Sequence, residues 1–393
     1  MSQALCKIGL IKSSGDHNKA AEAMFASAQH IVQSRKQQLQ NAGIDIELVV
    51  LDDFSDASTS CQKAKQLVSQ GCLAVIGPTD SHSFHQILLS NEVADVPIFA
   101  TIASASFLSS LQSQSFFRFT KSDYFRAEKL LLNLSSTYAN VQDVLVYSLA
   151  GPEFSYGQQL KCDITQAARE HRINVIHHDF SRDNMPAVFP AKNEPAVVCA
   201  QSAHVVELAT HLRAHKCRSQ LYTFGSNSNL LNSLTVNSIV ATDLDRDETD
   251  SMIGKELTQY FADFPDVQDA DTSTMNALCV LCNYLTDNPN VMQQDIANAR
   301  QSVINHLRQP KAKRTLNGDI TFLENGEMAG DETISLLRVK KRFNRYSFVP
   351  LSKKTKPHYY MRWNSIGVVS NVINILGVVV GVVGIVVTLI NFI

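Results

Sequence analysis

The chain has 393 residues, with 35 Lys or Arg against 37 Asp or Glu and a formal net charge of -2. This length accommodates two globular domains and a further terminal segment. The balanced charge provides no overall basic field, so we expect no nucleic-acid partner. The 8 cysteines follow no disulfide-framework spacing, which favours a reducing compartment.

Short apolar runs alternate with segments of helical periodicity along most of the chain. The first series has apolar runs near residues 5–12, 44–52, 73–77 and 96–101, with helices expected between them. A second series of the same kind begins after Lys121, and a mainly helical stretch over about 250–308 precedes three closing strands. Strands that are apolar throughout indicate parallel sheets covered on both faces. The prediction is therefore an α/β fold with two doubly wound parallel-sheet lobes.

The end of the chain is apolar and uncharged. At about 1.5 Å per residue, a helix over residues 372–393 would span roughly 33 Å, enough for a bilayer core of about 30 Å. We predict a transmembrane helix over 366–393 after a basic juxtamembrane linker over 351–365, with the lipid bilayer as a partner. A buried core segment is the alternative.

The flank of this segment predicts its orientation. No Asp or Glu follows Glu332, whereas Lys and Arg accumulate up to Arg362. Basic residues beside a span favour the cytoplasmic side. Residues 1–18 also lack the features of a cleavable secretory signal. We expect the lobes to be cytoplasmic.

The apolar tail contains a small-residue pattern. Gly377 and Gly381 form G-x-x-x-G, a spacing that lets two membrane helices approach closely. Asn371 and Asn374 precede it and could hydrogen-bond between helices. The tail is therefore predicted to self-associate. The alternative is that glycine is simply common in membrane helices.

Motifs for metal binding or catalysis are weak. Cys279 and Cys282 form a single C-x-x-C in an apolar helix, which favours a packed core. His211 and His215 have no third ligand nearby in sequence and are expected on a solvated helix face. The acidic stretch 243–250 lacks the Gly and Glu of a calcium loop. No nucleophile elbow or nucleotide-binding glycine motif occurs, so we predict no metal, no cofactor and no enzymatic activity.

Four stretches resemble the type I periplasmic binding proteins, the family of the branched-chain amino-acid receptors. They are LDDFSDASTSCQKAKQLVSQGCLAVIGPTDSHS, VPIFATIASASF, PEFSYGQQL and NGDITFLENGEMAGD. The resemblance extends over about residues 5–350. It implies a first lobe of 1–121 and 250–328 and a second of 122–249 and 329–350, which close over a small molecule by hinge bending.

The resemblance also implies ligand-binding residues in the first lobe. Ser81, at the end of GPTDS, matches a hydroxyl that binds a ligand carboxylate. Ala103 and Ser104, in TIASAS, match contacts to the carboxylate and amino group. Small hydroxylated residues at a helix N-terminus suit an anion on physical grounds as well. The alternative is an N-cap turn beside a surface loop.

The second lobe departs further from the family pattern. Tyr156 matches an aromatic that packs on the ligand, although a half-buried tyrosine at a helix start is equally expected. Gln201 and Ser202 are further lining candidates. Where amino-acid receptors often carry an acid, this chain has GSNSN, and Asn227 would suit a neutral polar group. This departure argues against an α-amino acid ligand.

The predicted function is a membrane-anchored sensor that closes two lobes over a small polar or anionic metabolite. One alternative is a membrane-acting effector whose lobes control assembly of the tail. A transport-linked solute receptor, inserted in the opposite orientation, is a lesser alternative. A homo-oligomer would form through the first lobe or the transmembrane helix. Neighbouring permease genes would favour transport, and neighbouring effector genes would favour the effector.

Overall fold

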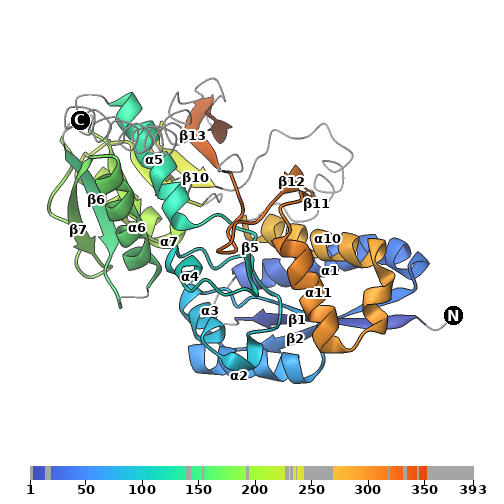
Figure 1. Ribbon diagram of the computed structural model, residues 1–393. Coiled ribbons are helices and arrows are strands. Elements are labelled where there is room, and N and C mark those ends of the chain that lie inside the picture. Colours follow the sequence, from blue (N-terminus) through green and yellow to red (C-terminus); the bar gives the residue numbers. More distant parts are fainter. Residues whose placement is uncertain are drawn as a thin grey trace, which may run out of the picture. The chain divides into compact units, whose positions relative to one another are not determined.

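The computed structural model consists of two compact units, Met1–Pro350 and Leu351–Ile393. Within the first unit, the strands form two main sheets with helices packed on their faces (Figure 1). The residues that the structure describes are 3–13, 19–138, 143–152, 155–191, 194–225, 230, 233–235, 237–242, 269–316, 318–330, 334–342 and 345–351.

The first sheet is parallel and has the strand order β2-β1-β3-β4-β5. Its strands are β1 (Ala4–Lys12), β2 (Ile44–Asp52), β3 (Ala74–Ile76), β4 (Ile98–Ala100) and β5 (Phe116–Arg118). Successive side chains of a strand point to opposite faces, and β4 illustrates the result. Phe99 packs in the core on one face, whereas Ile98 and Ala100 pack in the core on the other. This explains why the strands are apolar throughout.

Helices from both ends of the first unit cover this sheet. On one face lie α1 (Lys19–Asn41), α10 (Asp269–Asp287) and α11 (Ile296–Arg308), and on the other lie α2 (Ala57–Ser69) and α3 (Ser81–Leu88) (Figure 1). Short turns of helix are η1 (Asn91–Val93), α4 (Phe107–Ser110) and η2 (Pro289–Gln293). The first lobe is therefore completed by segments about 150 residues apart in the sequence.

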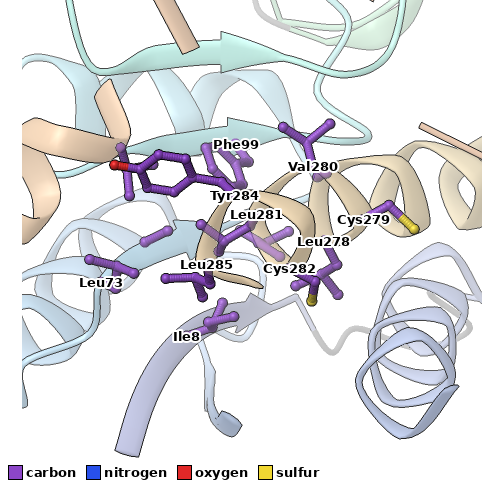
Figure 2. Packing of buried hydrophobic residues seen from close by; sticks show 14 of the residues in the cluster. Ile8, Leu73, Phe99, Leu278, Cys279, Val280, Leu281, Cys282, Tyr284 and Leu285 are labelled. Carbon is purple, nitrogen blue, oxygen red and sulfur yellow. The ribbon is translucent and has the colours of Figure 1, made fainter. Parts of the chain in front are cut away.

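The C-x-x-C pair lies inside this core. Cys279 and Cys282 on α10 are each 1% exposed and belong to the core cluster that includes Ile8 and Leu278, with Cys282 close to Leu278 (Figure 2). Burial raises the pKa of the Cys282 thiol. The prediction that the pair belongs to a packed core is confirmed.

The second sheet has the order β14-β13-β10-β9-β8-β6-β7. Its strands are β6 (Asp143–Leu149), β7 (Asn174–Phe180), β8 (Ala196–Cys199), β9 (Leu221–Phe224), β10 (Ile239–Thr242), β13 (Ser335–Arg342) and β14 (Arg345–Pro350), and its helices are α5 (Asp123–Thr137), α6 (Tyr156–Glu170) and α7 (Ser202–Ala214). Strands β6 to β10 are parallel, whereas β13 and β14 are antiparallel to their neighbours. A small hairpin of β11 (Lys313–Thr315) and β12 (Gly318–Ile320) completes the described strands.

The predicted α/β fold with two parallel-sheet lobes is confirmed, with one difference. The second sheet is mixed, because the closing strands return as an antiparallel hairpin at its edge. The residue boundaries proposed for the lobes stay predictions, since residues 243–268, which contain one of the expected crossings, lie outside the described residues.

None of the helices in the described part of the chain has the length and apolarity needed to cross a membrane. The predicted transmembrane helix over 366–393, with Gly377, Gly381, Asn371 and Asn374, lies outside the described residues. The same holds for residues 352–365 of the predicted linker.

Candidate functional site

Ser81 is the first residue of α3 and follows a tightly built turn. Gly77 has φ +88°, and a Cβ there would lie 2.6 Å from the carbonyl oxygen of Ile11, so only glycine fits. Asp80 caps the helix by accepting a hydrogen bond from the N–H of Ser83 at 2.8 Å. These contacts fix the half-buried Ser81 at the carboxyl end of β3.

The small-residue loop after β4 packs directly against Ser81. The Ser81 hydroxyl oxygen accepts a hydrogen bond from the N–H of Ala105 at 3.2 Å. In this bond the hydroxyl of Ser81 is the acceptor, so the bond does not use its own proton. Ala103 is 1% exposed, and Ser104 is 6% exposed. The bond to Ala105 places Ser81 beside the loop that contains Ala103 and Ser104, and the role of the three residues in ligand binding stays a prediction.

Ser104 is held differently from Ser81. Its hydroxyl donates to Asp123 Oδ2 at 2.8 Å, and Asp123 is fully buried at the start of α5. Arg126 donates to the other oxygen of Asp123 at 3.1 Å. Burial raises the pKa of Asp123, and the charge of Arg126 opposes that rise. Because its proton is committed to Asp123, Ser104 has only lone pairs to offer a ligand.

The buried side chain of Arg118 forms hydrogen bonds with the backbone of the loop 103–105. Arg118, at the end of β5, donates to the carbonyl oxygens of Ser104 at 3.0 Å and Ala105 at 2.7 Å. It also forms an ion pair with Glu327 at 3.3 Å, and Ser109 donates a hydrogen bond to the same carboxylate. Arg118 is fully buried, and the loop carbonyls therefore point toward the protein interior.

The crossing from β5 to α5 is bound to residues 326–330. The ammonium of Lys121, which is fully buried, donates to the carbonyl oxygens of Met328 at 2.8 Å and Ala329 at 3.3 Å, and also to that of Gly330. At Gly326, φ is +83° and a Cβ would lie 2.2 Å from the carbonyl oxygen of Phe116. Two crossings that the resemblance predicts are thus packed side by side.

A second contact joins the loop region to the second sheet's helices. Ser106 donates a hydrogen bond to Asp163 Oδ1 on α6. Asp163 is 3% exposed, and burial, followed by the nearby charge of Asp123, raises its pKa to about 7. Sequence reasoning missed this residue. The signal was present, because Asp163 shares the apolar face of α6 with Leu160 and Ile164.

The second-lobe candidates that the structure describes lie at the starts of α6 and α7. Tyr156 is the first residue of α6 and is half-buried. Gln201 is exposed and caps α7, and Ser202 is half-buried beside the end of β9. Asn227 lies outside the described residues.

The structure gives little support for a metal site at the candidate ligands His211 and His215. Among described residues, no group of three or more His, Cys, Asp or Glu could hold a metal ion. His211 and His215 stack on Phe189, with ring centroids 6.0 and 5.0 Å away, and only His215 is exposed. The expected solvated helix face is therefore only partly correct. The acidic stretch 243–250 lies outside the described residues.

Two surface hollows lie on the helices of the first lobe. One, of about 480 Å³, lies between α2 and α3, and another, of about 470 Å³, lies along α11. Neither is lined by Ser81 or by residues 103–105.

Comparison with known proteins agrees with this fold. Residues 20–205 match the family model described as receptor family ligand binding region. No curated protein matches the chain.

Three solved structures are similar over most of the chain. An ABC transporter substrate-binding protein from Desulfitobacterium hafniense in complex with Leu has a TM-score of 0.69 at 14% identity, covering 88% of this chain and 100% of that one. LivJ from Streptococcus pneumoniae in complex with isoleucine has a TM-score of 0.68 at 16% identity, covering 88% and 99%. A solute-binding protein from Rhodopseudomonas palustris BisB5 in complex with 3,4-dihydroxybenzoic acid has a TM-score of 0.68 at 12% identity, covering 89% and 97%.

We expect the two serines to differ in their effect on stability. Ser104→Ala removes a donor from the buried carboxylate of Asp123 and should lower the free energy of unfolding by about 1–3 kcal/mol. Ser81→Ala removes one half-buried acceptor and should cost less than about 1 kcal/mol. Urea unfolding of both variants, with the exposed Ser69→Ala as a control, measures the difference. Equal losses for Ser81 and Ser104 would contradict this assignment.

The matched family model is that of a ligand-binding region, and the similar structures are those of substrate-binding proteins, in agreement with the prediction of a binding protein. In its fold, this chain is similar to substrate-binding proteins of ABC transporters, and its residues 20–205 match the family model of a receptor ligand-binding region.

Proposed function

We propose that this chain is a sensor that closes its two lobes over a small carboxylate-bearing metabolite. The observation that carries the proposal is the fixed arrangement of Ser81 against the loop 103–105. Ser81 starts α3, where the helix dipole favours negative charge, and the bond to Ala105 does not use its hydroxyl proton.

The ligands of the similar structures support a carboxylate group in the ligand of this chain, but they do not support any particular ligand side chain. The ligands in the three similar structures are leucine, isoleucine and 3,4-dihydroxybenzoic acid, which share only the carboxylate among their functional groups. The 225–229 stretch of this chain, GSNSN, provides no acid for an ammonium group. A carboxylate without a required α-amino group therefore fits best, and a first screen should compare such carboxylates with the branched-chain amino acids.

Substitution of Ser81 tests the site. A screen of leucine, isoleucine, valine and 3,4-dihydroxybenzoate by thermal shift, followed by calorimetry, identifies a ligand. Ser81→Ala should then weaken binding by about 1.5–3 kcal/mol, because a hydrogen bond to a charged oxygen is lost. Ser69→Ala, on the exposed surface of the same lobe, should bind as the parent does. Unchanged affinity of Ser81→Ala would exclude this site.

We further propose that residues 366–393 anchor the protein in a membrane with its lobes in the cytoplasm. The uncharged run 372–393 and the basic residues that follow Glu332 support this orientation.

Cys162 provides a test of that orientation, because it is exposed on α6. In intact cells, a thiol reagent that cannot cross membranes should fail to label the full chain, and permeabilisation should allow labelling. Cys162→Ser should remove the signal from this site, which distinguishes it from the half-buried Cys61 and Cys217. Efficient labelling of Cys162 in intact cells would instead favour the transport-linked receptor.

A membrane-acting effector remains the second candidate function, and the tail sequence favours it. Gly377 and Gly381 have the spacing of closely packed membrane helices, and Asn371 and Asn374 would hydrogen-bond across such a pair. Ligand binding would control assembly only if the closed form assembles better than the open form.

A dimerisation reporter fused to residues 366–393 tests the effector. We expect a signal that falls when Gly377 and Gly381 are both replaced by Ile, since the larger side chains keep the helices apart. Replacement of Val378 and Val382 by Ile serves as a matched control beside the glycines. If the signal is absent, or unchanged by the glycine substitutions, the tail is only an anchor.

A further inference from the structure

Besides the bond from Ser104 to Asp123 on α5, a hydrogen bond from Ser106 connects the candidate ligand loop to α6 of the second sheet. Ser106 directly follows the loop 103–105 and precedes α4, and its hydroxyl donates to Asp163 Oδ1. Asp163 lies in the second turn of α6, which packs on β6 and α5. A change in the separation of the two lobes at this point must therefore break or distort this hydrogen bond.

The environment of Asp163 is unfavourable for a negative charge. The side chain is 3% exposed, and its Oδ2 atom has no hydrogen-bond partner among the described residues. Burying an ionised carboxylate with an unsatisfied oxygen is costly, because the oxygen loses water and gains no donor.

The charged groups around Asp163 come from several elements. Asp123 on α5 and Glu327 in the third crossing both disfavour its ionisation, whereas Arg118 on β5 and the Ser106 hydroxyl favour it. Tyr124 on α5 and Cys199 at the end of β8 also interact with this carboxyl. Arg118 is already paired with Glu327, and Arg126 with Asp123, so no described arginine near Asp163 is paired with its carboxyl alone.

We propose that Ser106 and Asp163 form a latch that holds the two lobes together while Asp163 is protonated and weakens when Asp163 ionises. A protonated carboxyl keeps the hydrogen bond from Ser106 at Oδ1 and carries its proton on the other oxygen, so no charge is buried. An ionised carboxyl gains water when the contact opens. The latch would make lobe separation depend on pH whatever the ligand is, and so extends beyond the proposed sensor.

The direction of the pH dependence follows from the two states. In the latched state the pKa of Asp163 is about 7, whereas a solvated Asp has a value of about 3.9. Below about pH 4 both states are protonated and the equilibrium does not change. Between about pH 4 and 7 the open state ionises first, so the latch weakens as the pH rises. The equilibrium shifts by at most about a thousandfold over that range.

The experiment measures lobe separation directly. Donor and acceptor dyes are attached through unnatural amino acids at the exposed positions Gln66 on α2 and Arg213 on α7, in the full chain in detergent. Energy transfer is recorded from pH 5 to pH 8 without ligand. We expect a population with shorter separation at pH 5 that decreases as the pH rises.

Three variants assign the effect to the latch. Asp163→Asn cannot ionise and should remain in the short-separation population at every pH. Ser106→Ala lacks the donor and should show the longer separation even at pH 5. Asp183→Asn, at an exposed site of the same lobe, should behave as the parent and serves as the matched control.

The same measurements contain the results that would overturn the latch. Histidines titrate in this range as well, so a pH-dependent separation that persists unchanged in Asp163→Asn would assign the effect to another group. A parent protein whose separation does not change between pH 5 and pH 8 would exclude the latch. Both results can be obtained without a ligand, so they are independent of the test of Ser81.

Discussion

The guanidinium of Arg118 connects the parts of the molecule on which binding depends. It donates to two carbonyls of the loop after β4 and pairs with Glu327 in the segment that returns toward the second sheet. A buried charge of this kind is stable only when several partners compensate it, and here the partners come from two stretches of chain, the loop after β4 and the segment around Glu327. The loop conformation, the end of β5 and the segment 326–330 therefore depend on one another.

This arrangement gives a physical route between a ligand and the lobes. A ligand at Ser81 would contact a loop whose next residues reach the second lobe through Ser104 and Ser106. Asp123 receives the first of these contacts at the start of α5, and Asp163 the second on α6. A displacement of the loop by a fraction of an ångström would alter both carboxylate contacts, since hydrogen bonds lose strength steeply with distorted geometry.

The two parallel-sheet lobes could be predicted from the sequence because each strand is recognised from its own short apolar run. Runs such as residues 73–77 and 96–101 are apolar on both faces, and that composition predicts a covered parallel strand whatever its neighbours are. The proximity of Ser81 to residues 103–105 could also be predicted, since loops after neighbouring parallel strands meet at one edge of the sheet.

The charged contacts could not be predicted in the same way. Lys121 donates hydrogen bonds to carbonyl oxygens more than 200 residues further along the chain. Hydrophobic periodicity in the sequence gives no information about such a distant pair. The sequence does indicate that Arg118 and Asp163 are buried, because each is a charged residue in an otherwise apolar segment. Their partners, however, could be identified only from the fold. The antiparallel return of β13 and β14 was missed because short strands of alternating character do not reveal their direction.

The division of the first lobe between distant segments has a consequence for synthesis of the protein. The sheet of β1 to β5 is complete once residue 118 has been translated, but one of its faces is covered in part by α10 and α11, which begin only at Asp269. At roughly 5–20 residues per second, the ribosome needs roughly 10–30 seconds to reach them. During that interval Phe99 and Phe117 lack part of their cover, and the nascent chain presents an apolar surface to which chaperones bind.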